Sequence, residues 1–367
     1  MKNVVIKIDH NFHPEDTEEF KLWKASRSDD YKKYRRDWSD LPINFIVSKV
    51  PLHLDIEATS NCNLLCTMCP RTTMVDDGTF WKVQEFDLNK YKDIIDECSS
   101  KGTKSVKYNY LGEPLMNKNI FEMISYAKSK GIIDLMFNTN ATSLTKSKAQ
   151  KILDSGLDQL FFSFDSPDKE TYEEVRVNAN YHKVLGNIKF FMELRNKSGS
   201  IEPLTRVSMV RLDQQDSEWG RFYKLFSPIV DTVAELDYMN HTEENGAHNL
   251  SDSFWKNLKK EHDKPSIDSE EVGDTTDKYC CPQLWQRMFI HPDGVVTPCC
   301  VDSSRIMVMG DVNSNSIEEI WGNDKYRMLR EMHSSGDIDR VSTCAKCPLA
   351  NLDEPTPALD LEMIETI

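Results

Sequence analysis

The sequence predicts an α/β protein built around six strands that alternate with helices. Apolar segments of strand length recur between residues 52 and 238, and segments with helical periodicity separate them. Gly102, Gly131 and Gly156 directly follow three of the helical segments, where helices commonly end. Such alternation implies parallel strands joined by right-handed crossovers. Six units are too few for a closed eight-stranded barrel, so we expect a partial (β/α)6 TIM-like barrel, with an open doubly wound sheet as the alternative.

The strands and helices of this core are expected in a regular order within residues 49–240. The six strands are expected at Leu52–Ile56, Ser105–Tyr110, Leu135–Asn138, Leu160–Phe164, Arg206–Val210 and Thr232–Tyr238. The helices between them are expected at Asp87–Ser100, Lys118–Lys130, Leu144–Ser155, Tyr181–Arg195 and Glu218–Phe226. In both folds ligands bind at the C-terminal ends of the strands.

Four further segments surround the core. Residues 1–48 form a polar extension in which Glu18–Trp38 is expected to be one helix, and we interpret the extension as a packing element or a lid. Residues 241–278 read as an acidic linker with one helix, Ser253–His262. Residues 279–350 are expected to form a second, smaller domain, and residues 351–367 an acidic tail.

The second domain has its own pattern. Met288–Ile290 and Val295–Thr297 flank His291-Pro292-Asp293-Gly294, which has the composition of a hairpin turn. Ile317–Met332 is expected to be an amphipathic helix.

Charge and hydropathy exclude several classes of protein. The 367 residues include 45 Lys and Arg against 60 Asp and Glu, a net charge of −15. A nucleic-acid or anionic-membrane binder needs a basic surface, so neither partner is expected. No apolar run reaches 18 residues, and the first residues lack the features of a signal peptide. We therefore expect a cytoplasmic protein.

The ten cysteines carry the strongest functional signal. In a cytosolic chain they are not expected to form disulfides. Three of them cluster within eight residues, and six crowd the C-terminal quarter about 210 residues later. The two clusters are Cys62, Cys66 and Cys69, and Cys280, Cys281, Cys299, Cys300, Cys344 and Cys347. Such spacing predicts two metal centres. Cys98 lies in a helical segment and is expected in the core.

The first cluster suits an iron–sulfur site. Its Cys-x3-Cys-x2-Cys spacing places three thiolates on one loop after the first strand, where they can hold three corners of a [4Fe–4S] cube. The fourth iron would then be open for chemistry. Zinc is the alternative, but structural zinc prefers four ligands and no fourth Cys or His is nearby in the sequence.

This motif resembles the signature of the radical S-adenosylmethionine (SAM) enzymes. The resemblance implies that the open iron chelates SAM and that one electron cleaves SAM to methionine and a 5′-deoxyadenosyl radical, which takes a hydrogen atom from a substrate. It also implies an electron donor such as flavodoxin or ferredoxin.

Further segments between residues 52 and 240 resemble the same family. Gly112-Glu113-Pro114 looks like its GGEP motif, with Leu111 replacing the first Gly. Asn138-Thr139-Asn140 is similar to its T-N-G segment, with Ala141 in place of Gly. An ordinary turn is the alternative for the first segment.

The remaining resemblances lie in the fourth strand, the helix after it and the cysteine loop. Ser163 opens an S-x-D segment, and Arg176 ends a Y-E-x-x-R segment, where a solvated helix charge is the alternative. Met68 stands where the family often has an aromatic residue. The resemblance thus assigns the SAM site to Met68, Gly112, Glu113, Asn138, Ser163 and Arg176.

The C-terminal cysteines resemble the SPASM/twitch extension of radical SAM enzymes. The shorter twitch form implies one auxiliary [4Fe–4S] cluster, held here by Cys281, Cys299, Cys344 and Cys347. Cys280 or Cys300 could replace its neighbour, and a zinc ribbon is the other alternative.

Three alternatives are considered for the function of the chain. We expect hydrogen abstraction from a small polar substrate such as a sugar, aminocyclitol or nucleotide-sugar, with dehydrogenation, epimerisation or dehydration as the outcome. A maturase of a ribosomally made peptide or protein is the second reading, although residues 1–48 are short and polar for a leader-binding domain. A non-catalytic metal module is the third. Positional candidates for substrate contact are Tyr108, Tyr110, Arg211 and Asp237.

Overall fold

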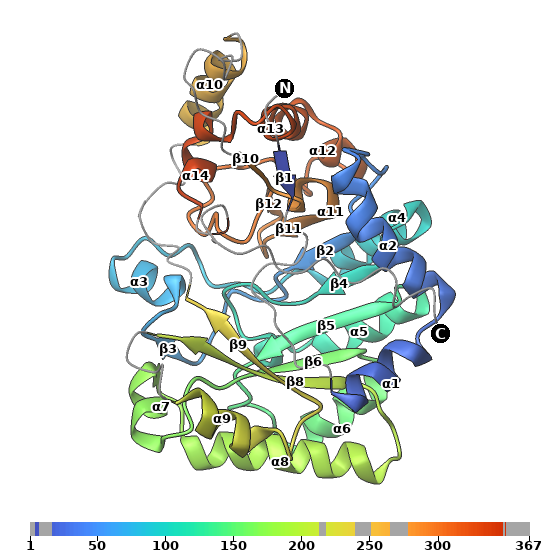
Figure 1. Ribbon diagram of the computed structural model, residues 1–367, viewed down its shortest axis with the longest axis vertical. Coiled ribbons are helices and arrows are strands. Elements are labelled where there is room, and N and C mark those ends of the chain that lie inside the picture. Colours follow the sequence, from blue (N-terminus) through green and yellow to red (C-terminus); the bar gives the residue numbers. More distant parts are fainter. Residues whose placement is uncertain are drawn as a thin grey trace.

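A computed structural model describes residues 4–6, 17–212, 218–238, 251–264, 278–347 and 349 (Figure 1). Its centre is a nine-stranded sheet with the order β13-β12-β11-β2-β4-β5-β6-β8-β9. In the described part of the chain, no helix is long and apolar enough to cross a membrane. The predicted acidic tail and most of the predicted linker lie outside the described residues, whereas the helix expected in the linker is present as α10 (Ser251–His262).

The predicted partial barrel is confirmed by six neighbouring parallel strands. Each pairs in parallel with the next along the order β2-β4-β5-β6-β8-β9. These strands are β2 (His53–Ile56), β4 (Ser105–Lys107), β5 (Asp134–Thr139), β6 (Gln159–Ser163), β8 (Leu204–Arg211) and β9 (Thr232–Asp237).

Helices cover the outer face of these strands. They are α4 (Leu88–Lys101), α5 (Ile120–Ser129), α6 (Lys146–Ser155), α8 (Tyr181–Lys197) and α9 (Trp219–Phe226). Their apolar side chains join one core with outward strand residues such as Leu54, Val106 and Val207. Cys98 on α4 is fully buried in this core, as predicted.

The inner face of the barrel carries many polar side chains. Successive strand residues point to opposite faces, and residues paired across parallel strands share a face. The residues that alternate with the buried apolar positions are therefore inward. They include Asp55, Lys107, Asn138, Ser163, Arg206 and Ser208. The barrel thus holds polar groups where a purely structural sheet would bury apolar ones.

The N-terminal extension forms two helices rather than the single predicted one. These are α1 (Glu18–Ser26) and α2 (Asp29–Ile43), and the side chain of Ser28 caps α2 by accepting from the Tyr31 N–H. They lie at the N-terminal ends of the strands, where the ring of Trp38 meets that of His53 at 5.8 Å (Figure 1). The extension is therefore a packing element beneath the barrel, at the end opposite the strand ends expected to hold ligands.

The C-terminal domain continues the sheet of the barrel, which the sequence did not predict. In it, β11 (Arg287–Ile290) pairs in parallel with β2, and β12 (Val295–Thr297) forms the predicted hairpin with β11. β13 (Gly310–Asp311) adds the last strand. Another strand, β10 (Lys278–Cys280), pairs with β1 (Val4–Ile6).

The predicted helix Ile317–Met332 is two helices, and this expectation was wrong. α12 (Ile317–Trp321) ends at Gly322, and the side chain of Asn323 caps α13 (Asp324–Ser334) by accepting from the Tyr326 N–H. Short elements complete the domain: α11 (Gln283–Gln286), η5 (Ile338–Arg340) and α14 (Ser342–Ala345). Figure 1 shows this domain at one edge of the barrel, above β2.

Candidate active site and auxiliary centre

The loop after β2 carries Cys62, Cys66 and Cys69, all partly exposed. It contains β3 (Leu65–Cys66) and leads into α3 (Pro70–Asp76), whose N-cap is Cys69. Burial raises the pKa of the Cys69 thiol, and the backbone amides of Arg71 and Thr72 at the start of α3 oppose this shift. Three partly exposed cysteines on one loop, at the C-terminal end of β2, fit an iron–sulfur cluster.

Two polar side chains support these sulfurs. Arg176 Nη1 lies 4.0 Å from the Cys66 Sγ, and Asn140 Nδ2 lies 3.9 Å from the Cys62 Sγ. Burial raises the pKa of the Cys66 thiol to about 12, and the Arg176 charge opposes this shift. The thiolate needed for metal binding is thus stabilised by a cation held next to it.

Arg176 is a buried residue, which excludes the solvated helix charge considered above. It follows α7 (Lys169–Val175) in the short strand β7 (Arg176–Val177), which pairs with β3 so that Arg176 faces Cys66. Its Nε lies 2.6 Å from an oxygen of Asp165, whose side chain is fully buried. Burial alone would lower the pKa of Arg176, but the charge of Asp165 raises it above its ordinary value.

The turn at Gly112 packs directly on the start of the cysteine loop. A Cβ on Gly112 would lie 1.7 Å from the carbonyl oxygen of Thr59, so no other residue fits without a shift of the backbone. The neighbouring Glu113 N–H donates to the Asn61 carbonyl at 2.8 Å. The glycine is therefore required by this close approach.

The carboxylate of Glu113 is engaged within the protein. It accepts hydrogen bonds from Thr139 Oγ1 at 2.7 Å, from the Asn140 N–H at 2.8 Å and from the Leu115 N–H at 3.1 Å. These bonds join the Gly112 turn to the C-terminal end of β5. In this structure Glu113 therefore orders the rim of the site.

Asn138 and Ser163 lie on the inner face near the C-terminal ends of β5 and β6, and Met68 is half-buried on the cysteine loop. The Oδ1 of Asn138 is buried and has no hydrogen-bond partner among the described residues. Ser208 on β8 is the register partner of Ser163, and its Oγ is also buried without a hydrogen-bond partner among the described residues. Sequence reasoning missed Ser208, although the two-residue alternation of its strand places it on the inner face.

The four positional candidates for substrate contact lie in different surroundings. Tyr108 is a core residue, because its hydroxyl lies 2.8 Å from that of Tyr91 in the interior. Tyr110 instead donates its hydroxyl to the Cys300 carbonyl at 2.8 Å. Arg211 is exposed beside Glu235 at 3.7 Å, and the side chain of Asp237 lies outside the described residues.

A buried acid links the Gly112 turn to the C-terminal domain. Glu57 follows β2 and accepts from the N–H groups of Leu111 and Gly112 at 3.0 and 3.1 Å. Its other oxygen lies 3.2 Å from Nδ1 of His291, in the turn after β11. Burial raises the pKa of Glu57 to about 7. No motif in the sequence indicates this pair, because its partners are 234 residues apart.

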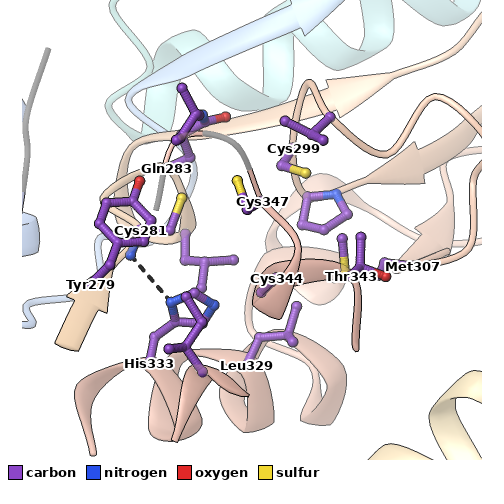
Figure 2. Close-up of a pocket in the computed structure, with 15 residues that line it drawn as sticks. Tyr279, Cys281, Gln283, Cys299, Met307, Leu329, His333, Thr343, Cys344 and Cys347 are labelled. Carbon is purple, nitrogen blue, oxygen red and sulfur yellow. Dashed lines mark hydrogen bonds between the residues drawn. The ribbon is translucent and has the colours of Figure 1, made fainter. Parts of the chain in front are cut away.

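The C-terminal cysteines surround a second pocket. Figure 2 shows Cys281, Cys299, Cys344 and Cys347 around it, together with apolar side chains such as Leu329. His333, which sequence reasoning also missed, accepts the Cys281 N–H at its Nδ1 at 3.2 Å. Cys280 and Cys300 do not line this pocket, and the Cys300 sulfur instead lies 3.7 Å from Gln283 Nε2.

The arrangement of these cysteine groups is compatible with iron–sulfur clusters. Within the described ranges, no three His, Cys, Asp or Glu side chains are close enough to hold one metal ion. A cubane cluster does not require such convergence, because each thiolate binds a different iron. The pocket is also lined by apolar residues, an environment that shields a cluster from solvent.

Comparison with known proteins agrees with this architecture. Residues 56–226 match the Radical SAM superfamily, and residues 280–348 match the SPASM iron–sulfur cluster-binding domain. The chain therefore belongs to the radical SAM enzymes that carry a C-terminal SPASM domain. Its cofactors are a SAM-binding [4Fe–4S] cluster, SAM, and auxiliary iron–sulfur at the C-terminal domain.

Particular relatives have different activities. A probable GTP 3′,8-cyclase from Methanococcus maripaludis is 24% identical, over 69% of this chain and 86% of that protein. The structure of Streptococcus suis SuiB bound to SAM matches with a TM-score of 0.58 and 15% identity, over 87% of this chain and 75% of SuiB. BtrN in complex with SAM and 2-DOIA matches with a TM-score of 0.50 and 18% identity, over 85% of this chain and 98% of BtrN. The structural matches show a shared fold.

Proposed function

We propose that this enzyme abstracts a hydrogen atom from a small polar substrate held inside the partial barrel. One observation carries the proposal: the cysteine loop lies at the C-terminal end of a barrel whose inner face carries many polar side chains. When bound, the cluster and SAM supply the 5′-deoxyadenosyl radical that the family uses. The helices α1 and α2 pack beneath the barrel, so a substrate would enter from the side of the cysteine loop.

The protein's own residues would do three things at this site. Cys62, Cys66 and Cys69 would hold the cluster, with Arg176 and Asn140 next to two of the sulfurs. Gly112 brings its turn against the cysteine loop, and Glu113 orders the rim. The unpartnered oxygens of Asn138 and Ser208 offer hydrogen bonds to SAM or to hydroxyl or amine groups of a substrate. Met68 and Ser163 are proposed as further SAM contacts.

We propose that one auxiliary [4Fe–4S] cluster is bound by Cys281, Cys299, Cys344 and Cys347. The shared pocket supports this set, and the different surroundings of Cys280 and Cys300 argue against their replacing their neighbours. Such a cluster can accept the electron released when a substrate radical is oxidised to a carbonyl or imine. A flavodoxin or ferredoxin as electron donor and a cytoplasmic location complete the proposal.

Peptide maturation is the second candidate. It is favoured by the fold shared with SuiB, a structure of which is described as bound to the precursor peptide SuiA. The small-substrate reading is preferred because, among the described residues, Asn138 and Ser208 hold buried, unpartnered oxygens on the inner face of the barrel.

Iron content after anaerobic reconstitution tests the proposed centres. Wild-type protein is expected to hold about eight irons, and a Cys62→Ala/Cys66→Ala/Cys69→Ala variant about four. A Cys281→Ala/Cys344→Ala variant is also expected to hold about four. Cys300→Ser is the matched control and should retain about eight. About four irons in the wild type would refute the auxiliary cluster.

Catalytic competence and substrate class need a second assay. With a chemical reductant, wild-type protein should convert SAM to 5′-deoxyadenosine, and the Cys62 triple variant should not. Faster SAM cleavage with a sugar or aminocyclitol would support the first reading. Dependence on a peptide would support the second reading, and absence of SAM cleavage from correctly loaded protein would refute both.

A further inference from the structure

Three cationic side chains occupy the inner face of the barrel, below the rim of the site. They are Lys107 on β4, Arg206 on β8 and Arg287 on β11. Lys107 pairs in register with Asp55, and Arg287 binds the same Asp55 through Nε and Nη2, both at 2.7 Å. Lys107 and Arg287 therefore lie on either side of one carboxylate. Three strand pairings separate β4 from β8, but the sheet curves around the inner face. The charge of Arg206 therefore also lowers the pKa of Lys107.

Two of the three cations, Arg287 and Arg206, have partners within the protein. Asp55 is engaged by Arg287 in a two-point ion pair, and Arg206 stacks on Phe161 with 3.9 Å between its guanidinium carbon and the ring centroid. Lys107 makes no hydrogen bond or ion pair within the described residues. Burial, together with the neighbouring arginines, lowers the pKa of Lys107 to about 8.

Lys107 is half-buried, so its ammonium group has lost part of its hydration. A partly desolvated charge is stabilised where a partner replaces the lost hydration. The chain has a net charge of −15, so its composition alone does not explain a concentration of cations here. A bound anion would neutralise Lys107 and complete the charge balance around Asp55.

We propose that the inner face binds an anionic group of the substrate, a carboxylate or a phosphate, through Lys107 with Arg206 beside it. The inference rests on the proposed function and refines it by naming the chemical class of the substrate. Ser208 lies two residues beyond Arg206, towards the C-terminal end of β8, and Asn138 lies two residues beyond Met136, the register partner of Lys107. The anionic end of the substrate thus lies deeper, and its hydroxyl or amine groups lie about 7 Å nearer the cysteine loop.

Thermal unfolding of the reconstituted, SAM-loaded enzyme tests the site without relying on turnover. Inorganic phosphate and acetate are compared with chloride at matched ionic strength. One of the two oxyanions is expected to raise the Tm by about 2 °C or more. A response to phosphate alone identifies a phosphorylated substrate, and a response to acetate alone identifies a carboxylate. No response to either anion overturns the proposal.

Variants locate the effect. Lys107→Met should abolish the rise in Tm, whereas Lys107→Arg should retain it. Without added anion, Lys107→Met should unfold no earlier than the wild type, because it removes a half-buried charge without breaking an ion pair. The exposed Lys183 on α8 provides the matched control, and Lys183→Met should respond as the wild type does. A response that survives in Lys107→Met, or a large loss of stability in that variant without anion, overturns the proposal.

Two further measurements separate this inference from its alternatives. Cys300 also lies near Lys107, and Cys300→Ser should keep the anion response. Loss of the response would mean that Cys300, rather than a ligand, is the partner of Lys107. SAM cleavage is measured on the same preparations. An anion response without SAM cleavage would refute the proposed function and leave the binding site standing, and SAM cleavage without an anion response would do the reverse.

Discussion

Replacing Arg176 with leucine should destabilise the protein strongly. The Asp165 side chain is fully buried, and its Oδ2 lies 2.6 Å from Arg176 Nε. Removing one partner of a buried ion pair costs about 3–5 kcal/mol, because the remaining charge is left without compensation. At about 2–4 °C per kcal/mol, the Tm should fall by about 6–20 °C.

A second substitution shows whether the uncompensated charge is the cause. Asp165→Asn removes the charge and keeps an oxygen that can accept the Val210 N–H, which Asp165 accepts at 3.0 Å. Arg176→Leu/Asp165→Asn should therefore recover at least half of the lost stability. Arg221 provides the control, because its ion pair with Asp168 is exposed and Arg221→Leu should lower the Tm by less than about 2 °C.

Anaerobic thermal unfolding of all four proteins measures these differences, and iron content is determined in parallel. Arg176→Leu and the double variant should both bind the cluster of the Cys62 loop less tightly, since both lack the cation 4.0 Å from the Cys66 sulfur. A fall in Tm of less than 2 °C for Arg176→Leu, or no recovery in the double variant, would refute the reasoning.

Other sites give shorter predictions. Gly112→Ala should lower SAM cleavage at least tenfold and destabilise the protein, because its Cβ would lie 1.7 Å from a backbone oxygen; Gly186→Ala on α8, with nothing within 4 Å, should leave both assays unaffected. The pKa of Glu57, raised to about 7, predicts that stability falls as the pH rises from about 4.5 to 7, since the folded state binds the extra proton. Thermal unfolding across this range should show a shallower fall in Glu57→Gln, and an unchanged slope would contradict the prediction. Trp38→Ala should lose about 3–5 kcal/mol of stability in denaturant unfolding while retaining both clusters, and loss of iron would argue against a purely structural role beneath the barrel.

Much of the fold follows from local signals. The alternation of strand and helix segments and the glycines after the helices predicted the six parallel strands of the core. The composition of His291-Pro292-Asp293-Gly294 predicted the hairpin. In two places the prediction merged a pair of neighbouring helices into one, because their apolar periodicity continues across the break between them. Ser28 and Asn323, which cap the second helix in each pair, were the available signals for dividing them.

The candidate site likewise combines features that local sequence indicates with contacts that only the fold brings together. The spacing of Cys62, Cys66 and Cys69 is local information, because a single loop carries all three. The role of Glu113 could not be read locally, since its carboxylate accepts from Thr139 and Asn140, which belong to the end of another strand. The doublets at Cys280 and Cys299 were ambiguous for a related reason: adjacent residues differ in orientation, and only folding shows which one lines the pocket.

The sequence by itself determined the thiolate spacing and the strand periodicity, because both depend on residues close together in the chain, and the resemblance of these motifs to the radical SAM enzymes supplied the class of enzyme. The tertiary structure alone decided that Glu57 lies beside His291, that β11 extends the barrel sheet and that Lys107 shares an inner face with Arg206 and Arg287. These relations join residues about 100 or more positions apart. They depend on how a curved sheet brings distant strands around a common interior, and no local pattern records that closure.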